Sequence, residues 1–142
     1  MIKRNSLTPA ALLLLTLACA GAAAQAQMPY PSKPVRFIVP SAAGGGTDII
    51  ARALAQKLSE SLGQQFVVDN RPGAGQMIGI ELAAKSAADG HTILMAASTL
   101  AINQIMYKTV PYDPLRDFAP ITQAASLANV LVVHPSLPVK SV

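Results

Sequence analysis

The feature that most constrains the fold is a short run of β-branched and apolar residues, followed by a glycine-rich turn and then a helical stretch. The first strand is expected at Val35–Val39, since Pro40 and the glycines after it end a strand. Thr47 or Asp48 is then expected to cap a helix that stops at Gly63. The apolar residues expected to face inward at the helical period are Ile49, Ile50, Ala53, Leu54, Leu58 and Leu62.

The same unit follows twice more along the chain. Strands are expected at 66–68 and 92–97, and helices at 77–85 and 100–107. In the first of these helices the expected inward residues are Ile78, Leu82 and Ala83. Strands that alternate with helices at this spacing form right-handed βαβ units, in which helices cover both faces of a parallel sheet. The sequence therefore predicts an α/β fold.

In an open parallel sheet, ligands bind at the edge shared by the loops that leave the carboxyl ends of the strands. Here these loops are 40–47, 69–76 and 97–99. Glycines let the backbone approach a ligand, and the free N–H groups of a helix start suit an anion, so a carboxylate or phosphate site is predicted. Arg71 either pairs with such a ligand or braces its loop, and bracing is favoured. The residues chosen by this pattern are Gly44, Gly45, Gly46, Thr47, Asp48, Gly75, Ser98 and Thr99.

Cofactor and metal sites are not predicted. No Gly-Lys-Ser/Thr follows the glycines at 44–46, so the loop that binds nucleotide phosphates is not matched. Gly73, Gly75 and Gly79 resemble an irregular form of the glycine motif that binds dinucleotides. In that motif the first glycine directly follows the strand, whereas here residues 70–72 lie between. No His, Asp and Glu residues cluster at the spacing of metal ligands.

Catalytic residues are not predicted either. Asp48 is more typical of a helix-capping residue with a second role in ordering the glycine loop or a bridging water. Ser41 and Ser98 lack the Gly-x-Ser-x-Gly turn that exposes a nucleophile. His91 and His134 have no partner placed by the sequence, so both are interpreted as surface or edge residues.

The first residues, 1–26, have the pattern of a signal peptide. Lys3 and Arg4 form a basic start, 10–20 is an apolar stretch, and a small-x-small site ends at Ala26. The apolar stretch is shorter than the roughly 20 residues that a membrane span needs. We therefore expect cleavage after Ala26, a periplasmic location and no stable membrane insertion.

The cysteine content and the distribution of charge argue against cysteine-based sites and against a nucleic-acid partner. Cys19 is the single cysteine and lies in the leader, where Thr16 replaces the Leu of a lipidation motif. A chain cleaved after Ala26 then has no disulfide, no thiolate zinc site and no thiol catalysis. The net charge is +4, but its basic residues are scattered singly rather than clustered on one segment. No nucleic-acid partner is expected, since phosphate binding needs a basic face.

Motifs in a fixed order carry a resemblance to a known family. They are YPSKPVR at 30–36, AGGGTDI at 43–49, QQFVVDNRPGAG at 64–75, ADGHT at 88–92 and VPYDPLRDFAPI at 110–121. Through them the chain, from Tyr30 to Val142, resembles the Bug-type periplasmic solute receptors of tripartite tricarboxylate transporters.

The resemblance implies a type II periplasmic-binding-protein fold, whose two lobes close on a small carboxylate held by loop backbone amides and bridging waters. It also implies a receptor, not an enzyme, that delivers the carboxylate to membrane permease subunits. Ser41-Ala42 stands where family members often have an aromatic residue and a proline, which leaves the substrate's identity open. Carried over residue by residue, the ligand-binding positions are Ser41, Ala42, Ala43, Gly44, Gly45, Gly46, Thr47, Asp48, Ser98 and Thr99.

Family members are longer than this chain, so a truncation before most of the second lobe is expected. The expected organisation is a leader at 1–26, an incomplete first lobe at 27–117, and a truncated segment at 118–142 that begins the second lobe. This last segment is expected to hold crossover strands at 118–123 and 130–133. Binding is expected to be impaired, because closure needs two lobes. Two alternatives stay open: an α/β enzyme that uses the glycine loop for a phosphorylated substrate, and a non-functional remnant.

Overall fold

The computed structural model describes residues 29–126, 128 and 132–138. The chain divides into two units, Met1–Ser32 and Lys33–Val142, and the helices and strands described here belong to the second. The predicted signal peptide, its cleavage site at Ala26 and Cys19 lie outside the described residues. Cleavage and export therefore stay predictions.

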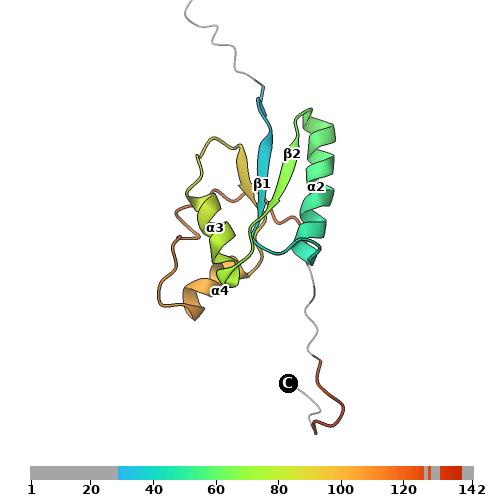
Figure 1. Ribbon diagram of the computed structural model, residues 1–142, viewed down its shortest axis with the longest axis vertical. Coiled ribbons are helices and arrows are strands. Elements are labelled where there is room, and N and C mark those ends of the chain that lie inside the picture. Colours follow the sequence, from blue (N-terminus) through green and yellow to red (C-terminus); the bar gives the residue numbers. More distant parts are fainter. Residues whose placement is uncertain (1–28, 127, 129–131, 139–142) are drawn as a thin grey trace, which may run out of the picture. The chain divides into compact units, whose positions relative to one another are not determined.

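A three-stranded parallel sheet in the order β2-β1-β3 forms the centre of the second unit. Its strands are β1 Val35–Val39, β2 Phe66–Asn70 and β3 Thr92–Leu94. The helices are α2 Gly46–Leu62, α3 Met77–Ala84 and α4 Thr99–Met106, and a 3₁₀ turn, η1, covers Ala74–Gln76. Helices α2 and α3 flank the sheet on its two sides (Figure 1). The predicted α/β class with a mainly parallel sheet is confirmed.

Strand β1 is the central strand, and its side chains are buried on both faces. Val35, Phe37 and Val39 form one core with residues of α2 and β2. Ile38 points to the opposite face, since successive side chains of a strand alternate, and it is fully buried there. A strand buried on both faces has a nearly continuous apolar sequence, which explains why this one was predicted within its observed bounds.

Helix α2 begins earlier than expected, and its inward face was predicted only in part, since Leu54 and Leu58 pack against the core as expected. Its N-cap is Gly45, so the prediction that Thr47 or Asp48 caps it is wrong; Asp48 lies inside the first turn. The stop at Gly63 is confirmed, with φ +69°. Ile49, predicted inward, is 62% exposed, and Ala53 and Leu62 are exposed as well. The buried residues are Asp48, Ala51 and Ala55, because small side chains let the helix approach the sheet closely.

The inward face of helix α3 was also predicted only in part, since Leu82 and Ala83 are partly buried but Ile78 is not. Ile78 is 51% exposed, whereas Gly79 and Ile80 are buried. Gly79 lies against the backbone of Pro40 and Arg71, where a larger side chain would force these atoms to shift. The position of a glycine carries no apolar signal, so the inward face could not be assigned from apolar residues alone.

The third strand is shorter than expected. Strand β3 ends at Leu94 instead of Ala97, although the Met95 N–H still donates to the Ile38 carbonyl at 2.9 Å. Residues 118–123, where a crossover strand was predicted, have no regular secondary structure, because no described segment pairs with them. The other predicted crossover strand, 130–133, lies partly outside the described residues. The division at 117/118 stays a prediction.

Candidate functional site

The loops that leave β1, β2 and β3 all lie at the carboxyl edge of the parallel sheet, as the topology requires. The backbone of 42–46 is exposed at this edge, and Ser41 is partly buried. Asp48, by contrast, is only 2% exposed. The glycine loop is therefore an open segment that is attached to the fold through a buried carboxylate.

Asp48 connects the glycine loop to α2. Its Oδ2 atom accepts a hydrogen bond from the Gly44 N–H at 2.8 Å and another from Arg52 Nε at 2.9 Å. Gly44 has φ +83°, a left-handed conformation that costs a glycine little. The sequence interpretation gave Asp48 a second role in ordering this loop, and the Gly44 hydrogen bond is the contact that performs it.

Asn70, the last residue of β2, completes the set of donors around Asp48. Its Nδ2 atom donates to Asp48 Oδ1 at 2.9 Å and to the Ser41 carbonyl at 3.1 Å. Its Oδ1 atom accepts from Arg52 Nη2 at 3.0 Å. Three segments of the chain, the β1–α2 loop, α2 and the end of β2, thus meet in one hydrogen-bonded network.

This network decides the charge of Asp48. The hydrogen bond from Arg52, then those from the Gly44 N–H and Asn70, lower the pKa of Asp48 to about 2. The carboxylate is ionised at neutral pH and its charge is balanced by Arg52. Because a general base works best with a pKa near the ambient pH, Asp48 is not suited to proton transfer. The balanced charge also leaves the glycine loop able to accept an anion.

The free hydrogen-bond donors of the edge lie where α2 begins. The first N–H groups of a helix have no partner inside the helix. No hydrogen bond among the described residues uses the backbone N–H of Gly46 or Thr47. The Ser41 hydroxyl is also without a partner among the described residues, although its oxygen is buried. The amides of Gly46 and Thr47 are therefore available to a ligand with acceptor oxygens.

The loop after β3 is held by a contact with the loop after β2. Thr99 Oγ1 donates to Gln76 Oε1 at 2.6 Å, so the hydroxyl predicted to bind a ligand is already used within the fold. Asn103, buried in α4, donates to the Gly75 carbonyl at 3.0 Å and to the Tyr112 hydroxyl at 3.2 Å. Ser98 is exposed at the start of α4. Of the two residues predicted in this loop, Ser98 is the one with an unengaged hydroxyl in the described structure.

Arg71 braces its loop, as the sequence favoured. Its Nε atom donates to Asp69 Oδ1 at 2.9 Å, and Arg36 Nε donates to Asp69 Oδ2 at 2.7 Å. Burial raises the pKa of Asp69, but the two guanidinium groups outweigh this effect and hold it below its usual range. One carboxylate thus pairs with both arginines.

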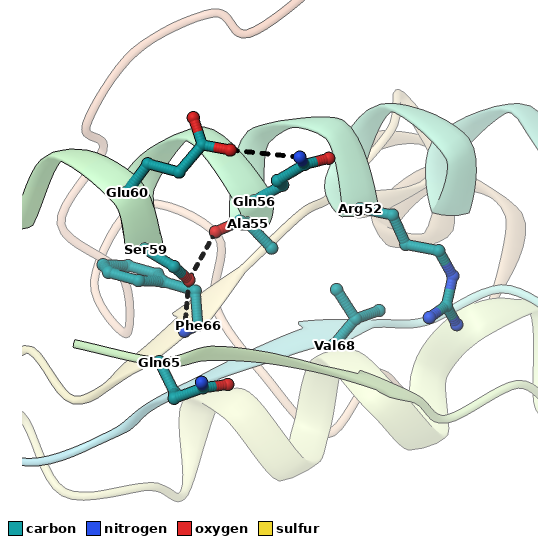
Figure 2. Close-up of a pocket in the computed structure, with 8 residues that line it drawn as sticks. All are labelled: Arg52, Ala55, Gln56, Ser59, Glu60, Gln65, Phe66 and Val68. Atoms are coloured by element: carbon teal, nitrogen blue, oxygen red, sulfur yellow. Dashed lines mark hydrogen bonds between the residues drawn. The ribbon is translucent and has the colours of Figure 1, made fainter. Parts of the chain in front are cut away.

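A groove with a volume of about 410 Å³ lies between α2 and β2. Figure 2 shows that Ser59 joins α2 to β2 in this groove: the Ser59 hydroxyl donates to the Ala55 carbonyl at 2.7 Å and accepts from the Phe66 N–H at 2.9 Å. None of the residues predicted to bind a ligand lines this groove. Its lining residues are Arg52, Ala55, Gln56, Ser59, Glu60, Gln65, Phe66 and Val68.

The described residues contain neither a candidate metal centre nor a helix able to span a membrane. No group of three or more His, Cys, Asp and Glu side chains in the described part of the chain is arranged to hold a metal ion. Among the described helices, none combines the length and the apolarity that crossing a membrane requires.

Comparison with known proteins gives the family. The sequence pattern described as "Tripartite tricarboxylate transporter family receptor" (TctC) matches residues 50–142. The chain belongs to this TctC receptor family. It is 46% identical to the "UPF0065 protein in tcbD-tcbE intergenic region" of Pseudomonas sp. strain P51, over 85% of this chain and 36% of that protein. It is 42% identical to protein BugT of Bordetella pertussis, over 92% of this chain and 41% of BugT.

Solved structures agree with the TctC assignment. The periplasmic binding protein BugD is 41% identical with a TM-score of 0.63, over 65% of this chain and 31% of BugD. Rpa4515 of R. palustris, solved with adipate, is 40% identical with a TM-score of 0.59, over 61% of this chain and 29% of Rpa4515. MatC of Rhodopseudomonas palustris, solved with malate, is 31% identical with a TM-score of 0.56, over 64% of this chain and 31% of MatC. The chain spans well under half the length of each of these proteins.

Arg52 and Asn70 were not predicted as part of the site. The Asp48–Arg52 pair has the i,i+4 spacing of a helical ion pair, which is a signal that was present in the sequence. Asn70 carried no such signal, because it meets Asp48 only when β2 pairs with β1, in the register that places Val39 opposite Asn70.

Proposed function

We propose that this TctC-family protein is an exported receptor that binds a small carboxylate and delivers it to a membrane transporter. The observation that carries the proposal is the start of α2, where the amides of Gly46 and Thr47 have no partner among the described residues. They lie in an exposed glycine loop that Asp48 holds in place.

The charge of the edge supports an anionic ligand. The N-terminus of a helix carries a partial positive charge, and its amides donate to carboxylate oxygens. Asp48 does not oppose this, because its carboxylate is neutralised by Arg52 and turned toward the loop backbone. The ligand positions of the proposal are those mapped from the family: Ser41, Ala42, Ala43, Gly44, Gly45, Gly46, Thr47, Asp48, Ser98 and Thr99.

The relatives support a carboxylate in particular. Rpa4515 was solved with adipate and MatC with malate, and both are small dicarboxylates. Loop backbone amides can bind either, because a carboxylate presents the same two oxygens whatever chain lies between the groups. We therefore propose a small carboxylate as the ligand class, without a choice between these two.

The proposal includes no catalytic step. The depressed pKa of Asp48 makes it a poor proton acceptor, and the family is described as a receptor. The alternative, an α/β enzyme that binds a phosphorylated substrate at the glycine loop, would need a titratable group with a partner that can relay a proton.

Location, domains and partners complete the proposal. Residues 1–26 act as a signal peptide cleaved after Ala26, which brings the protein to the periplasm. Residues 27–117 form a first lobe, and 118–142 begin a second. Permease subunits in the membrane receive the ligand.

A thermal-shift screen of the purified protein tests the ligand class, since a ligand that binds only the folded state raises the melting temperature. Malate, adipate, amino acids and nucleotides are compared at equal concentration. A rise with a dicarboxylate and none with nucleotides is expected. A rise with nucleotides alone would contradict the receptor, and the absence of a cooperative melt would favour a non-functional remnant.

A further inference from the structure

Asn70 uses both ends of its side-chain amide to join separate parts of the candidate site. Its nitrogen donates to the Ser41 carbonyl and to the Asp48 carboxylate, at 3.1 Å and 2.9 Å. Its oxygen accepts from Arg52 at 3.0 Å. The opposite orientation of the amide would place its oxygen against two acceptors and its nitrogen against a cation, so the partners define one orientation.

These contacts fix the segment 41–44 at both ends. Asn70 holds its first residue directly through the Ser41 carbonyl. It holds the last residue indirectly, because Asp48, which Asn70 positions, accepts from the Gly44 N–H. A glycine loop that is free in solution loses conformational entropy on binding, and a loop fixed beforehand avoids much of that loss.

We propose that Asn70 is a positioning residue for the anion site, which sets the glycine loop from the neighbouring strand without touching the ligand. The expected effect of Asn70 on ligand affinity rests on the proposed function. Its effect on the order of the glycine loop rests only on the hydrogen bonds around Asn70 and can be tested without any ligand.

A purely structural role for Asn70, as a stabiliser of the end of β2, makes a different prediction. In that case, replacing Asn70 lowers the melting temperature but leaves the Gly44 amide as protected as before, since Arg52 still bonds to Asp48. Protection of one loop amide therefore separates the two roles.

The test compares Asn70→Ala with Gln56→Ala, a control that removes one exposed hydrogen bond, to Glu60, within α2. Hydrogen exchange of the Gly44 amide is measured by NMR on the full chain without ligand. We expect exchange about tenfold faster or more in Asn70→Ala, the loss typical of a hydrogen bond to a charged group, and no change in Gln56→Ala. Affinities for malate and adipate, measured by calorimetry, are expected to fall by about the same factor in Asn70→Ala alone.

A rescue variant makes the test specific. Asn70→Asp alone places two carboxylates against each other and should release Gly44. Adding Asp48→Asn exchanges donor and acceptor, so the pair bonds again and protection of Gly44 should return, while the Ser41 contact stays lost. If Asn70→Ala does not fold, Arg52→Met tests the same network from an exposed position, with faster Gly44 exchange expected.

Gly44 exchange that is unchanged in a folded Asn70→Ala protein, or a double variant no better than Asn70→Asp, would overturn the inference. If the unmodified protein binds neither malate nor adipate, the proposed ligand class is what fails. The exchange measurement then still supports or overturns the positioning role.

Discussion

At Gly79, helix α3 packs against the start of the loops that leave β1 and β2. A Cβ atom at this position would lie 2.7 Å from the Arg71 carbonyl oxygen and 2.8 Å from the Pro40 Cα atom. Both are backbone atoms, which cannot swing away as the end of a side chain can. Pro40 and Arg71 begin the loops that leave β1 and β2, so Gly79→Ala presses α3 against the edge that carries the site.

The magnitude follows from two opposing effects. Replacing glycine by alanine in a helix interior stabilises it by about 1 kcal/mol. Overpacking a buried site costs about 1–3 kcal/mol, and contact with backbone on two sides places this case in the upper part of that range. We expect a net loss of about 1–2 kcal/mol in the free energy of unfolding, which lowers the melting temperature by roughly 4–16 °C in a domain of this size.

The matched control is Gly46→Ala, in α2. A Cβ atom at Gly46 meets no atom within 4 Å, so this alanine should leave the stability unchanged or raise it slightly. Both variants are measured by urea denaturation followed by circular dichroism. If Gly79→Ala were as stable as Gly46→Ala, the close approach of α3 to the loops, and with it this account of the edge, would be refuted.

Three further predictions concern the hydrogen bonds around Asp48, the C-terminal end of α2 and the hydrogen bonds of Asn103. Arg52, Gly44 and Asn70 lower the pKa of Asp48 to about 2, so the contribution of its carboxylate to loop order is present above the unfolded pKa of 3.8 and lost as the pH falls toward 2. The NMR shift of the Gly44 amide should therefore be constant from neutral pH to about 4. A titration midpoint near pH 4 would contradict the network. Because Gly63 has φ +69°, Gly63→Ala should lower the free energy of unfolding by about 1 kcal/mol, and Gly63→Asn should lower it by less. Equal stability of both variants and the unmodified protein in urea would contradict the left-handed C-cap. Asn103→Leu leaves the Gly75 carbonyl and the Tyr112 hydroxyl without this donor and should cost about 1–3 kcal/mol, whereas Ile105→Ala, at a side chain 87% exposed, should change the urea midpoint little.

The sheet could be predicted from the sequence because its signals are local. Val35–Val39 is apolar except for Arg36 and ends at Pro40, which is typical of a central parallel strand. The buried face of α2 could be predicted only in part: Leu54 and Leu58 pack against the core as expected, but the fully buried positions were not predicted. This helix has apolar residues on more than one side, and packing selected Ala51 and Ala55, whose small size permits close approach, over the larger Ile49.

The candidate site was predictable only in part, for a related reason. The glycine loop and Asp48 are contiguous, so strand, turn and helix signals place them together. Asn70 reaches the same point from a different strand, and Thr99 is engaged by Gln76 from a different loop. Contacts between segments depend on strand register and loop path, which local patterns do not contain.

The central claim is that the backbone amide at the start of α2 binds the carboxylate, and replacing Gly46 tests it directly. Gly46 is the first helical residue, and Gly45 before it is extended at φ −75° and ψ 164°, so proline fits here and removes only the N–H. Calorimetric titration of malate and adipate compares Gly46→Pro with Gly46→Ala, which retains the amide. The account predicts that Gly46→Pro folds but binds at least about tenfold more weakly than Gly46→Ala. Equal affinity in the two variants would contradict it.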